Sequence, residues 1–300
     1  MKKKTYLIAL MAMALTLDSC SDNENGIGGE TSKYITVSTS IGNMTRVATD
    51  ANGAQTFEEG DEISVYAWTG DATVAPETRE RVVNNAINKL TNGSWVATPQ
   101  MLWKNNRDKH YFIGVYPTAA ISDLSAGEYT FDVNKQTESD LLVAVNKDGL
   151  SYNVDEQQPV PLTFTHVMAK LVVNLTYKNQ WGGIPTVEKV VVGNAAKEAT
   201  INYLTKAVTP STTAKEDFSL PEITENTKYV SVIIPQEEVK QLTIVIGGKN
   251  FVYDNGTPFK LESGKITTVN LEVGRDEIKL GDVKITNWED GSTFSGEALN

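Results

Sequence analysis

Cysteine is nearly absent from this sequence, since Cys20 is the only one in 300 residues. A single cysteine excludes any disulfide within the chain. Histidine is almost as scarce: His110 and His166 are the only two, and neither has another His or a Cys at the spacing of metal ligands. We therefore expect no metal site of the ordinary kind, and no motif indicates a bound cofactor.

Basic residues are also in the minority, with 27 Lys and Arg against 38 Asp and Glu and a formal net charge of −11. Nucleic-acid binding needs clustered Lys and Arg, so nucleic acid is not an expected partner. No GxSxG, Walker or GxGxxG motif is present. Neighbouring carboxylates such as Glu58 and Glu59 would point to opposite faces of a strand, which does not make an acid–base pair. We therefore predict that the protein is not an enzyme.

Long apolar runs are missing except at the N-terminus, where Lys2, Lys3 and Lys4 precede the apolar residues 6–17. A basic segment followed by a short apolar segment is typical of a secretory signal and is too short to span a bilayer as a mature helix. Cys20 ends this region and resembles the lipidated cysteine of a bacterial lipobox. We predict a signal peptide over residues 1–19 and acylation of Cys20, which would hold the protein to a membrane by lipid alone. The alternative is a conventional signal peptide with an incidental cysteine.

The polar residues 21–30 after Cys20 are predicted to form a tether. Beyond them, residues 35–41 alternate between apolar and polar side chains, which predicts a strand with Ile35, Val37, Thr39 and Ile41 on one face. Glycines 247 and 248 predict a two-residue hairpin. Residues 79–90 are ambiguous, because their apolar side chains have helical spacing. Further strands are predicted at residues 63–68, 111–117, 129–133, 141–145, 189–192, 199–204, 229–234, 242–246, 250–253, 266–273 and 278–288.

The segment 162–177 carries two alternating patterns of opposite parity, and the parity changes near Ala169. An uninterrupted strand would turn its apolar side chains outward at that point, so the change predicts a bulge or a single helical turn. We interpret the segment as the seam between two β-domains, over residues 47–160 and 161–300; an ordinary core strand is the alternative. Many short strands and little helix predict an all-β protein of β-sandwich type.

Tryptophans in this sequence allow two interpretations. Trp68, Trp95, Trp103 and Trp181 are candidates for flat platforms under sugar rings, but core packing is the more ordinary role of large aromatics in a sandwich.

Several segments together resemble the fimbrillin family of Bacteroidales, the type V pilins, in an order that runs from the lipobox to the C-terminal tail. The segments are FEEGDEISVYA (57–67), YFIGVYP (111–117), FTH and AKL (164–166 and 169–171), IPQ (234–236), GKITTV (264–269) and ITNW (285–288). The resemblance implies two transthyretin-like β-sandwich domains in tandem. It also implies that residues 79–90 are extended, against their helical spacing.

The same resemblance implies a mode of assembly. Fimbrillins reach the outer membrane surface as lipoproteins, an arginine-specific surface protease cuts after a loop arginine, and a strand from a neighbouring subunit fills the groove left by the severed N-terminal strand. The position that matches in this chain is Arg46, followed by Val47, so that residues 20–46 would be the tether and the removable strand. The alternative is that Arg46 is an incidental loop arginine.

Candidate donor residues lie in the C-terminal segment 276–300 and are Ile278, Leu280, Val283, Ile285 and Trp288. Their parity slips at Gly281 and Asp282, so a continuous donor strand needs a bulge there. The segment is either donated to a neighbour or paired within its own chain, as suits a tip subunit or a closed precursor.

The expected partners are other fimbrial subunits in a homo- or heteropolymer, outer-membrane lipid through Cys20, the protease, and a glycan or protein on a host or bacterial surface. The alternative function is a non-polymerising, glycan-binding surface lipoprotein with Trp68, Trp95 and Trp103 as platforms.

Overall fold

The structure, a computed structural model, describes residues 34–42, 57–152 and 158–288, with no account of the side chains of 255–257. These residues belong to the second of two compact units, residues 32–300. In the described ranges, helix is confined to two short 3₁₀ turns, η1 (Thr78–Glu80) and η2 (Asn179–Trp181), and all other regular structure is strand. The predicted all-β class is confirmed.

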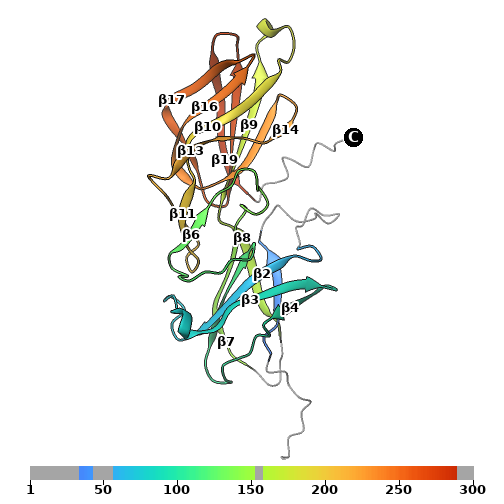
Figure 1. The fold of residues 1–300 in the computed structure, drawn as a ribbon, viewed down its shortest axis with the longest axis vertical. Helices are drawn as coiled ribbons and strands as arrows, with labels where there is room; N and C mark the ends of the chain where they lie inside the picture. Colours follow the sequence, from blue (N-terminus) through green and yellow to red (C-terminus); the bar gives the residue numbers. More distant parts are fainter. Residues whose placement is uncertain (1–33, 43–56, 153–157, 289–300) are drawn as a thin grey trace, which may run out of the picture. The chain divides into compact units, whose positions relative to one another are not determined.

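A seven-stranded sheet contains the N-terminal strands and has the order β1-β8-β7-β5-β2-β3-β4 (Figure 1). Its strands are β1 (Val37–Ile41), β8 (Val160–His166), β7 (Leu142–Leu150), β5 (His110–Tyr116), β2 (Glu62–Thr69), β3 (Arg81–Thr91) and β4 (Ser94–Thr98). Every neighbouring pair is antiparallel except β1 and β8, which run parallel.

Three smaller sheets contain most of the remaining chain. Their orders are β14-β15-β9-β18-β19, β13-β10-β16-β17 and β12-β11-β6. The strands of the first are β14 (Glu222–Thr224), β15 (Lys228–Ile233), β9 (Ala169–Tyr177), β18 (Lys265–Val273) and β19 (Ile278–Asn287). Those of the others are β13 (Lys215–Ser219), β10 (Val187–Ala196), β16 (Gln236–Ile246), β17 (Lys249–Leu261), β12 (Ala207–Pro210), β11 (Glu198–Asn202) and β6 (Gly127–Thr130).

The hairpin between β16 and β17 confirms the prediction from the glycine pair. Ile246 pairs with Lys249, and Gly247 and Gly248 between them have φ of 56° and 71°. Both values lie in the left-handed region, which glycine enters without the steric cost of a Cβ.

The parity change in the segment 162–177 marks a change of sheet. β8 ends at His166 in the seven-stranded sheet, and β9 begins at Ala169 in the five-stranded one. The two residues between them, Val167 and Met168, are both buried. The chain therefore crosses between sheets where we had predicted a bulge or a helical turn. When the chain passes into another sheet, the set of alternate side chains that faces the core can change from odd to even positions. A bulge has the same effect on the sequence pattern, so the pattern alone does not distinguish the two.

Residues 79–90 are mostly extended, as the family resemblance implied. Within β3, the buried side chains of Val83 and Ala86 are three residues apart, and Asn85 between them has φ of 57°. The partner strand β2 shows a register shift at the same place. One extra residue in a strand gives a spacing of three, and this bulge is why the apolar pattern looked helical.

The central strands of the seven-stranded sheet are buried on both faces. On β2, Ile63 and Val65 belong to one apolar cluster, while Tyr66 and Trp68 on the other face belong to a larger cluster that extends through the smaller sheets. The smaller cluster also contains residues from β1 and from the segment after β4, among them Ile35 and Met101. The two edges of the seven-stranded sheet, at β1 and at β4, thus contribute side chains to the same apolar cluster.

Candidate functional site

The first strand follows the predicted alternation. Ile35 and Val37 are 1% and 5% exposed, Thr39 and Ile41 are partly buried, and the residues between them face solvent. Their neighbours in the apolar cluster include Phe164 of β8. The predicted N-terminal strand therefore has a place in the core.

The backbone around β1 is hydrogen-bonded on both sides. On one side, Val160 N–H donates to the Thr36 carbonyl at 2.8 Å, and the parallel register continues to Ile41 opposite Phe164. On the other side, Ile35 N–H donates to the Met101 carbonyl at 2.9 Å. β1 itself is thus an edge strand paired with β8, and the residues just before it are held by the segment that follows β4. No local pattern indicated this second contact, because Met101 is distant along the chain and lies outside any strand.

Loss of this strand would uncover both a backbone edge and an apolar slot. The edge of β8 from Val160 to Phe164 would lose its partner, and Ile35 and Val37 would leave their places in the core. Burial of two such side chains contributes about 3–6 kcal/mol at roughly 1.5–3 kcal/mol each. An unpaired edge beside an apolar slot is a template for the addition of another strand.

The C-terminal strand β19 is paired within its own chain. It lies antiparallel to β18 at the edge of the five-stranded sheet (Figure 1). The predicted bulge at Gly281 and Asp282 is confirmed: Val269 pairs with Val283 and Leu271 with Leu280, so β19 has one residue more than β18. Asn270 Nδ2 donates to Asp282 Oδ1 at 2.6 Å at this point.

Exposure separates the donor candidates into three groups. Val283 and Ile285 are each 37% exposed, Ile278 and Leu280 are partly buried, and Trp288 is only 1% exposed. Most of β19 thus lies on the surface, and only the residue after its end is fully enclosed.

A cleft of about 770 Å³ is lined by the first residues of β3 and by the segment 102–104. The half-buried Trp103 and the exposed Leu102 line it, together with the cationic side chains of Arg79 and Lys104. Trp68 also lines this cleft but is 1% exposed, and its indole N–H donates to the Asp71 carbonyl at 2.9 Å. Trp68 therefore cannot serve as the sugar platform that the alternative function assigned to it, because the core covers its ring.

The other tryptophans pack at the borders of the cores. Trp95 lies edge-on to Phe57 at 5.3 Å between ring centroids, and its indole N–H donates to Thr39 Oγ1 at 3.0 Å. Trp181 lies 5.8 Å from Phe251 in the same edge-on manner. Each keeps a partly exposed surface but does not line the cleft described above, which is lined by the buried Trp68 and the partly exposed Trp103.

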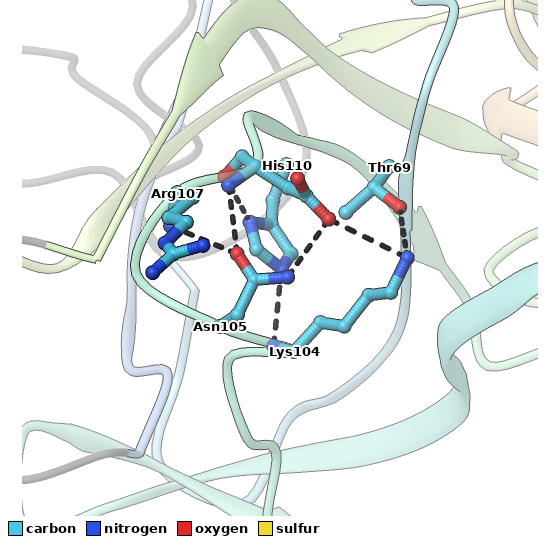
Figure 2. Close-up of polar contacts among 6 residues, drawn as sticks. Thr69, Lys104, Asn105, Arg107 and His110 are labelled. Carbon is cyan, nitrogen blue, oxygen red and sulfur yellow. Dashed lines mark hydrogen bonds and ion pairs between the residues drawn. The ribbon is translucent and has the colours of Figure 1, made fainter.

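His110 lies at the end of a loop that begins with Lys104, and the polar contacts of this loop are drawn in Figure 2. Lys104 N–H donates to His110 Nε2 at 3.1 Å, and His110 Nδ1 lies 3.0 Å from the Asp108 carbonyl. Because Nε2 accepts, the proton is on Nδ1 and the ring is neutral. Burial lowers the pKa of His110 and so favours this neutral form.

The remaining contacts of this network are hydrogen bonds and one ion pair, between Lys104 Nζ and Asp108 Oδ2 at 3.5 Å (Figure 2). Asn105 Nδ2 donates to Asp108 Oδ2 at 2.8 Å, and Lys104 Nζ donates to Thr69 Oγ1 at 3.0 Å. The hydrogen bond from Asn105 is the main reason why the pKa of Asp108 is lowered. The hydrogen bonds of His110 and Asn105 thus hold the loop, which indicates a structural role for this histidine.

Three predicted site residues, Cys20, Arg46 and Val47, lie outside the described residues. Within the described ranges, no group of three or more His, Cys, Asp and Glu side chains is placed to hold a metal ion. The described part of the chain also contains no helix that is long and apolar enough to cross a membrane.

Comparisons with known proteins agree with this architecture. The family model described as "Fimbrillin-like" matches residues 45–288. The curated protein named "Putative fimbrium subunit Fim1C", from Bacteroides uniformis, is 25% identical over 315 residues, which cover 97% of each chain.

Two crystal structures, each described as that of "a putative cell adhesion protein", share the fold. The one from Bacteroides uniformis has a TM-score of 0.63 and 20% identity, and the match covers 86% of this chain and 100% of that one. The one from Bacteroides ovatus has a TM-score of 0.62 and 18% identity over 85% of this chain and 98% of that one.

Sheet topology alone defines this molecule as an all-β protein with a parallel N-terminal edge strand and an antiparallel C-terminal one. The family match spans most of the sequence and includes both sides of the β8–β9 crossing. The chain belongs to the fimbrillin-like family, as its sequence motifs had indicated.

Proposed function

We propose that the protein is a fimbrial subunit that is exported as a surface lipoprotein and assembles by strand exchange after cleavage at Arg46, and that the polymer supports adhesion. The role is structural and non-catalytic. Two things support the assembly step: membership of the fimbrillin-like family, and the place of β1 as an edge strand whose side chains fill a core. The observation that carries the proposal is the burial of Ile35 and Val37 in a strand that precedes Arg46.

The acceptor site in this proposal is the slot of β1. Release of β1 opens the edge of β8 on one side and the Met101 carbonyl on the other. An incoming strand would restore these hydrogen bonds and rebury the apolar slot, whereas an empty slot leaves both exposed to water. Ordering of the incoming segment opposes binding, so the donor needs apolar side chains at the spacing of Ile35 and Val37.

The donor in this proposal is β19. Val283 and Ile285 are two residues apart, as are Ile35 and Val37, and their present exposure leaves apolar area still to be buried. Transfer of β19 into the slot of a neighbour would bury this area, which favours the exchanged state. Within a single chain β19 is paired with β18, so the described form corresponds to a precursor whose last strand is still to be released, or to a tip subunit that donates none.

Membrane attachment in this proposal is through Cys20. Acylation after removal of residues 1–19 would tether the subunit until cleavage at Arg46 separates the body from the lipid. A Cys20→Ser variant is expected to lose membrane attachment, measured by detergent partitioning and by metabolic labelling with a fatty acid. A labelled Cys20→Ser protein would contradict the assignment.

Controlled cleavage tests the assembly step. Purified residues 20–300 treated with an arginine-specific protease are expected to lose the N-terminal strand and form ladders of polymers on size-exclusion chromatography. The matched control is Arg46→Ala, which keeps the strand and is expected to stay monomeric. A cleaved wild-type protein that stays monomeric, with β1 verified by mass spectrometry to have dissociated, would rule out a stalk subunit.

The cleft beside Trp103 favours glycan binding as a second candidate function. The partly exposed indole of Trp103 gives this cleft a flat apolar surface of the kind that stacks on a sugar ring. Cationic side chains (Arg79, Lys104) and carboxylates (Asp71, Glu80) line it as well, so the cleft offers both donors and acceptors to sugar hydroxyls. Glycan arrays with Trp103→Ala, compared with Trp95→Ala as a control outside the cleft, test it. A sugar signal that survives Trp103→Ala would exclude the cleft as its site.

A further inference from the structure

Trp288 is the one fully buried side chain in the described part of the C-terminal segment, residues 276–288. All ten residues of β19, Ile278–Asn287, are exposed or partly exposed, whereas Trp288, just past the strand, is 1% exposed. A Trp side chain has the largest apolar area of any residue, so a single buried Trp can outweigh several half-exposed aliphatic side chains. Besides the backbone pairing with β18 and the partly buried Ile278 and Leu280, the largest apolar burial of this edge therefore lies at Trp288, just past the strand.

The socket of Trp288 is made of groups from two other parts of the chain. The His166 ring stacks on the Trp288 ring with centroids 4.2 Å apart and an interplanar angle of 7°. Lys170 Nζ lies 5.5 Å from the centroid of the same ring. Both residues flank the β8–β9 crossing, so the C-terminal tryptophan is held where the chain passes between sheets.

The backbone fixes the position of the tryptophan as well. Trp288 N–H donates to the Gly264 carbonyl at 3.1 Å, and Gly264 N–H donates to the Met168 carbonyl at 2.9 Å. Gly264 has φ of 67°, and a Cβ added there would lie 3.0 Å from the His166 carbonyl oxygen. Only glycine suits this position, because a side chain would strain the turn and push on the residue that stacks against Trp288.

His166 is itself held in place from behind. Its Nδ1 lies 2.8 Å from Asp140 Oδ1, and the two side chains are 1% and 2% exposed. A buried pair of this kind is costly unless its geometry is maintained, so it fixes the plane of the imidazole. The stacking surface for Trp288 is thus preorganised.

We propose that His166, Lys170 and Gly264 form a recognition site for the indole of Trp288, and that this one contact decides whether β19 stays on its own sheet or is released. The inference rests on the proposed role of β19 as a donor strand and adds a control point to it. With Trp288 in its socket the precursor is closed. Once Trp288 leaves, the remaining strand is held by edge hydrogen bonds and half-exposed side chains and exchanges readily.

Hydrogen exchange on the uncleaved, monomeric chain tests the contact without any need for assembly. In Trp288→Ala, the amides shared by β18 and β19 are expected to exchange about 100-fold faster, as follows from the loss of a buried Trp side chain. Amides of the β2–β5 pair are expected to keep their wild-type rates. The matched control is Ile285→Ala on the exposed face of β19, which is expected to change the exchange rates by less than about threefold.

Equal acceleration of the β18–β19 and β2–β5 amides in Trp288→Ala would mean that the variant has lost global stability only, and would overturn the proposal. A second variant, His166→Phe with Asp140→Leu, keeps an aromatic ring against Trp288. Because both partners of the buried pair are replaced together, neither is left buried without the other, so this variant is expected to fold. The proposal requires that this double variant retain protection of β19.

A peptide exchange experiment measures recognition directly. A labelled peptide of residues 276–288 is added to full-length Trp288→Ala protein, beside the same peptide with alanine in place of Trp288. We expect the Trp peptide to bind at least about tenfold more tightly, and to bind the wild-type chain more weakly because its own Trp288 competes. Equal binding of the two peptides would sink the proposal. Failure of the cleaved chain to polymerise, with this selectivity intact, would instead count against strand exchange alone.

Discussion

The two terminal strands of this protein are both edge strands, but they are attached in opposite ways. β1 is held along its length: its apolar side chains enter a core and its backbone is bonded to β8 and to Met101. β19 has one neighbour, β18, and exposed side chains, and is fixed at its end by Trp288. Removal of β1 would leave an apolar slot in a core. Removal of β19 would uncover one edge of β18 and little buried apolar surface apart from that of Trp288. This contrast matches the acceptor and donor roles proposed above.

The largest change in the free energy of unfolding is expected when a charge is introduced into β1, and the same change in β19 tests the contrast. Val37→Asp would bury an unpaired carboxylate in the core of the seven-stranded sheet, so we expect a loss of about 3–5 kcal/mol in the free energy of unfolding. The matched change Ile285→Asp on β19 places the charge on a partly exposed side and is expected to cost less than about 1 kcal/mol. Urea denaturation of the uncleaved protein measures both. Similar losses in the two variants would remove the distinction.

A smaller effect is expected where β1 contacts β4. Thr39→Val removes the acceptor of the Trp95 indole N–H while keeping the shape of the side chain. We expect a loss of about 1 kcal/mol in the free energy of unfolding, since the indole is left without this partner. Ser38→Ala, on the solvent-facing side of β1, is the control and is expected to be nearly neutral. If Thr39→Val has the same urea-denaturation midpoint as the wild type, the contact with Trp95 does not stabilise β1.

The smallest predicted effect is the contribution of His110 to the loss of stability at acidic pH. Burial lowers the pKa of His110 below its ordinary value of 6.5, so the unfolded chain binds a proton at higher pH than the folded one does. The stability from neutral His110 is therefore fully present above pH 6.5 and is lost as the pH falls from there through the lowered pKa. Thermal unfolding between pH 7.5 and 5 is expected to decline less steeply in His110→Gln by about 1 °C or more. An identical decline in the two proteins would contradict the neutral assignment of His110.

Local pattern was sufficient for much of the fold. Alternation identified β1 and its inward side chains, the glycine pair identified the β16–β17 turn, and the slipped parity at Gly281 and Asp282 identified the bulge in β19. All three depend on neighbours in the sequence. Where pattern misled, at Val83 and Ala86, a bulge had given a strand the spacing of a helix.

The candidate site needed information that no local pattern contains. Nothing near Ile35 indicates a bond to Met101, and nothing near Trp288 indicates that His166 stacks on it. The sequence also left the C-terminal segment either donated or self-paired, and the structure pairs it with β18.

Composition and alternation alone showed that this chain is acidic and consists of many short strands, because both are properties of single residues and their neighbours. The tertiary structure decided which strands pair, that β1 runs parallel to β8, and that Trp288 rests on His166. Pairing joins residues that are far apart along the chain, and the free energy that selects one partner over another comes from contacts that exist only in the folded state.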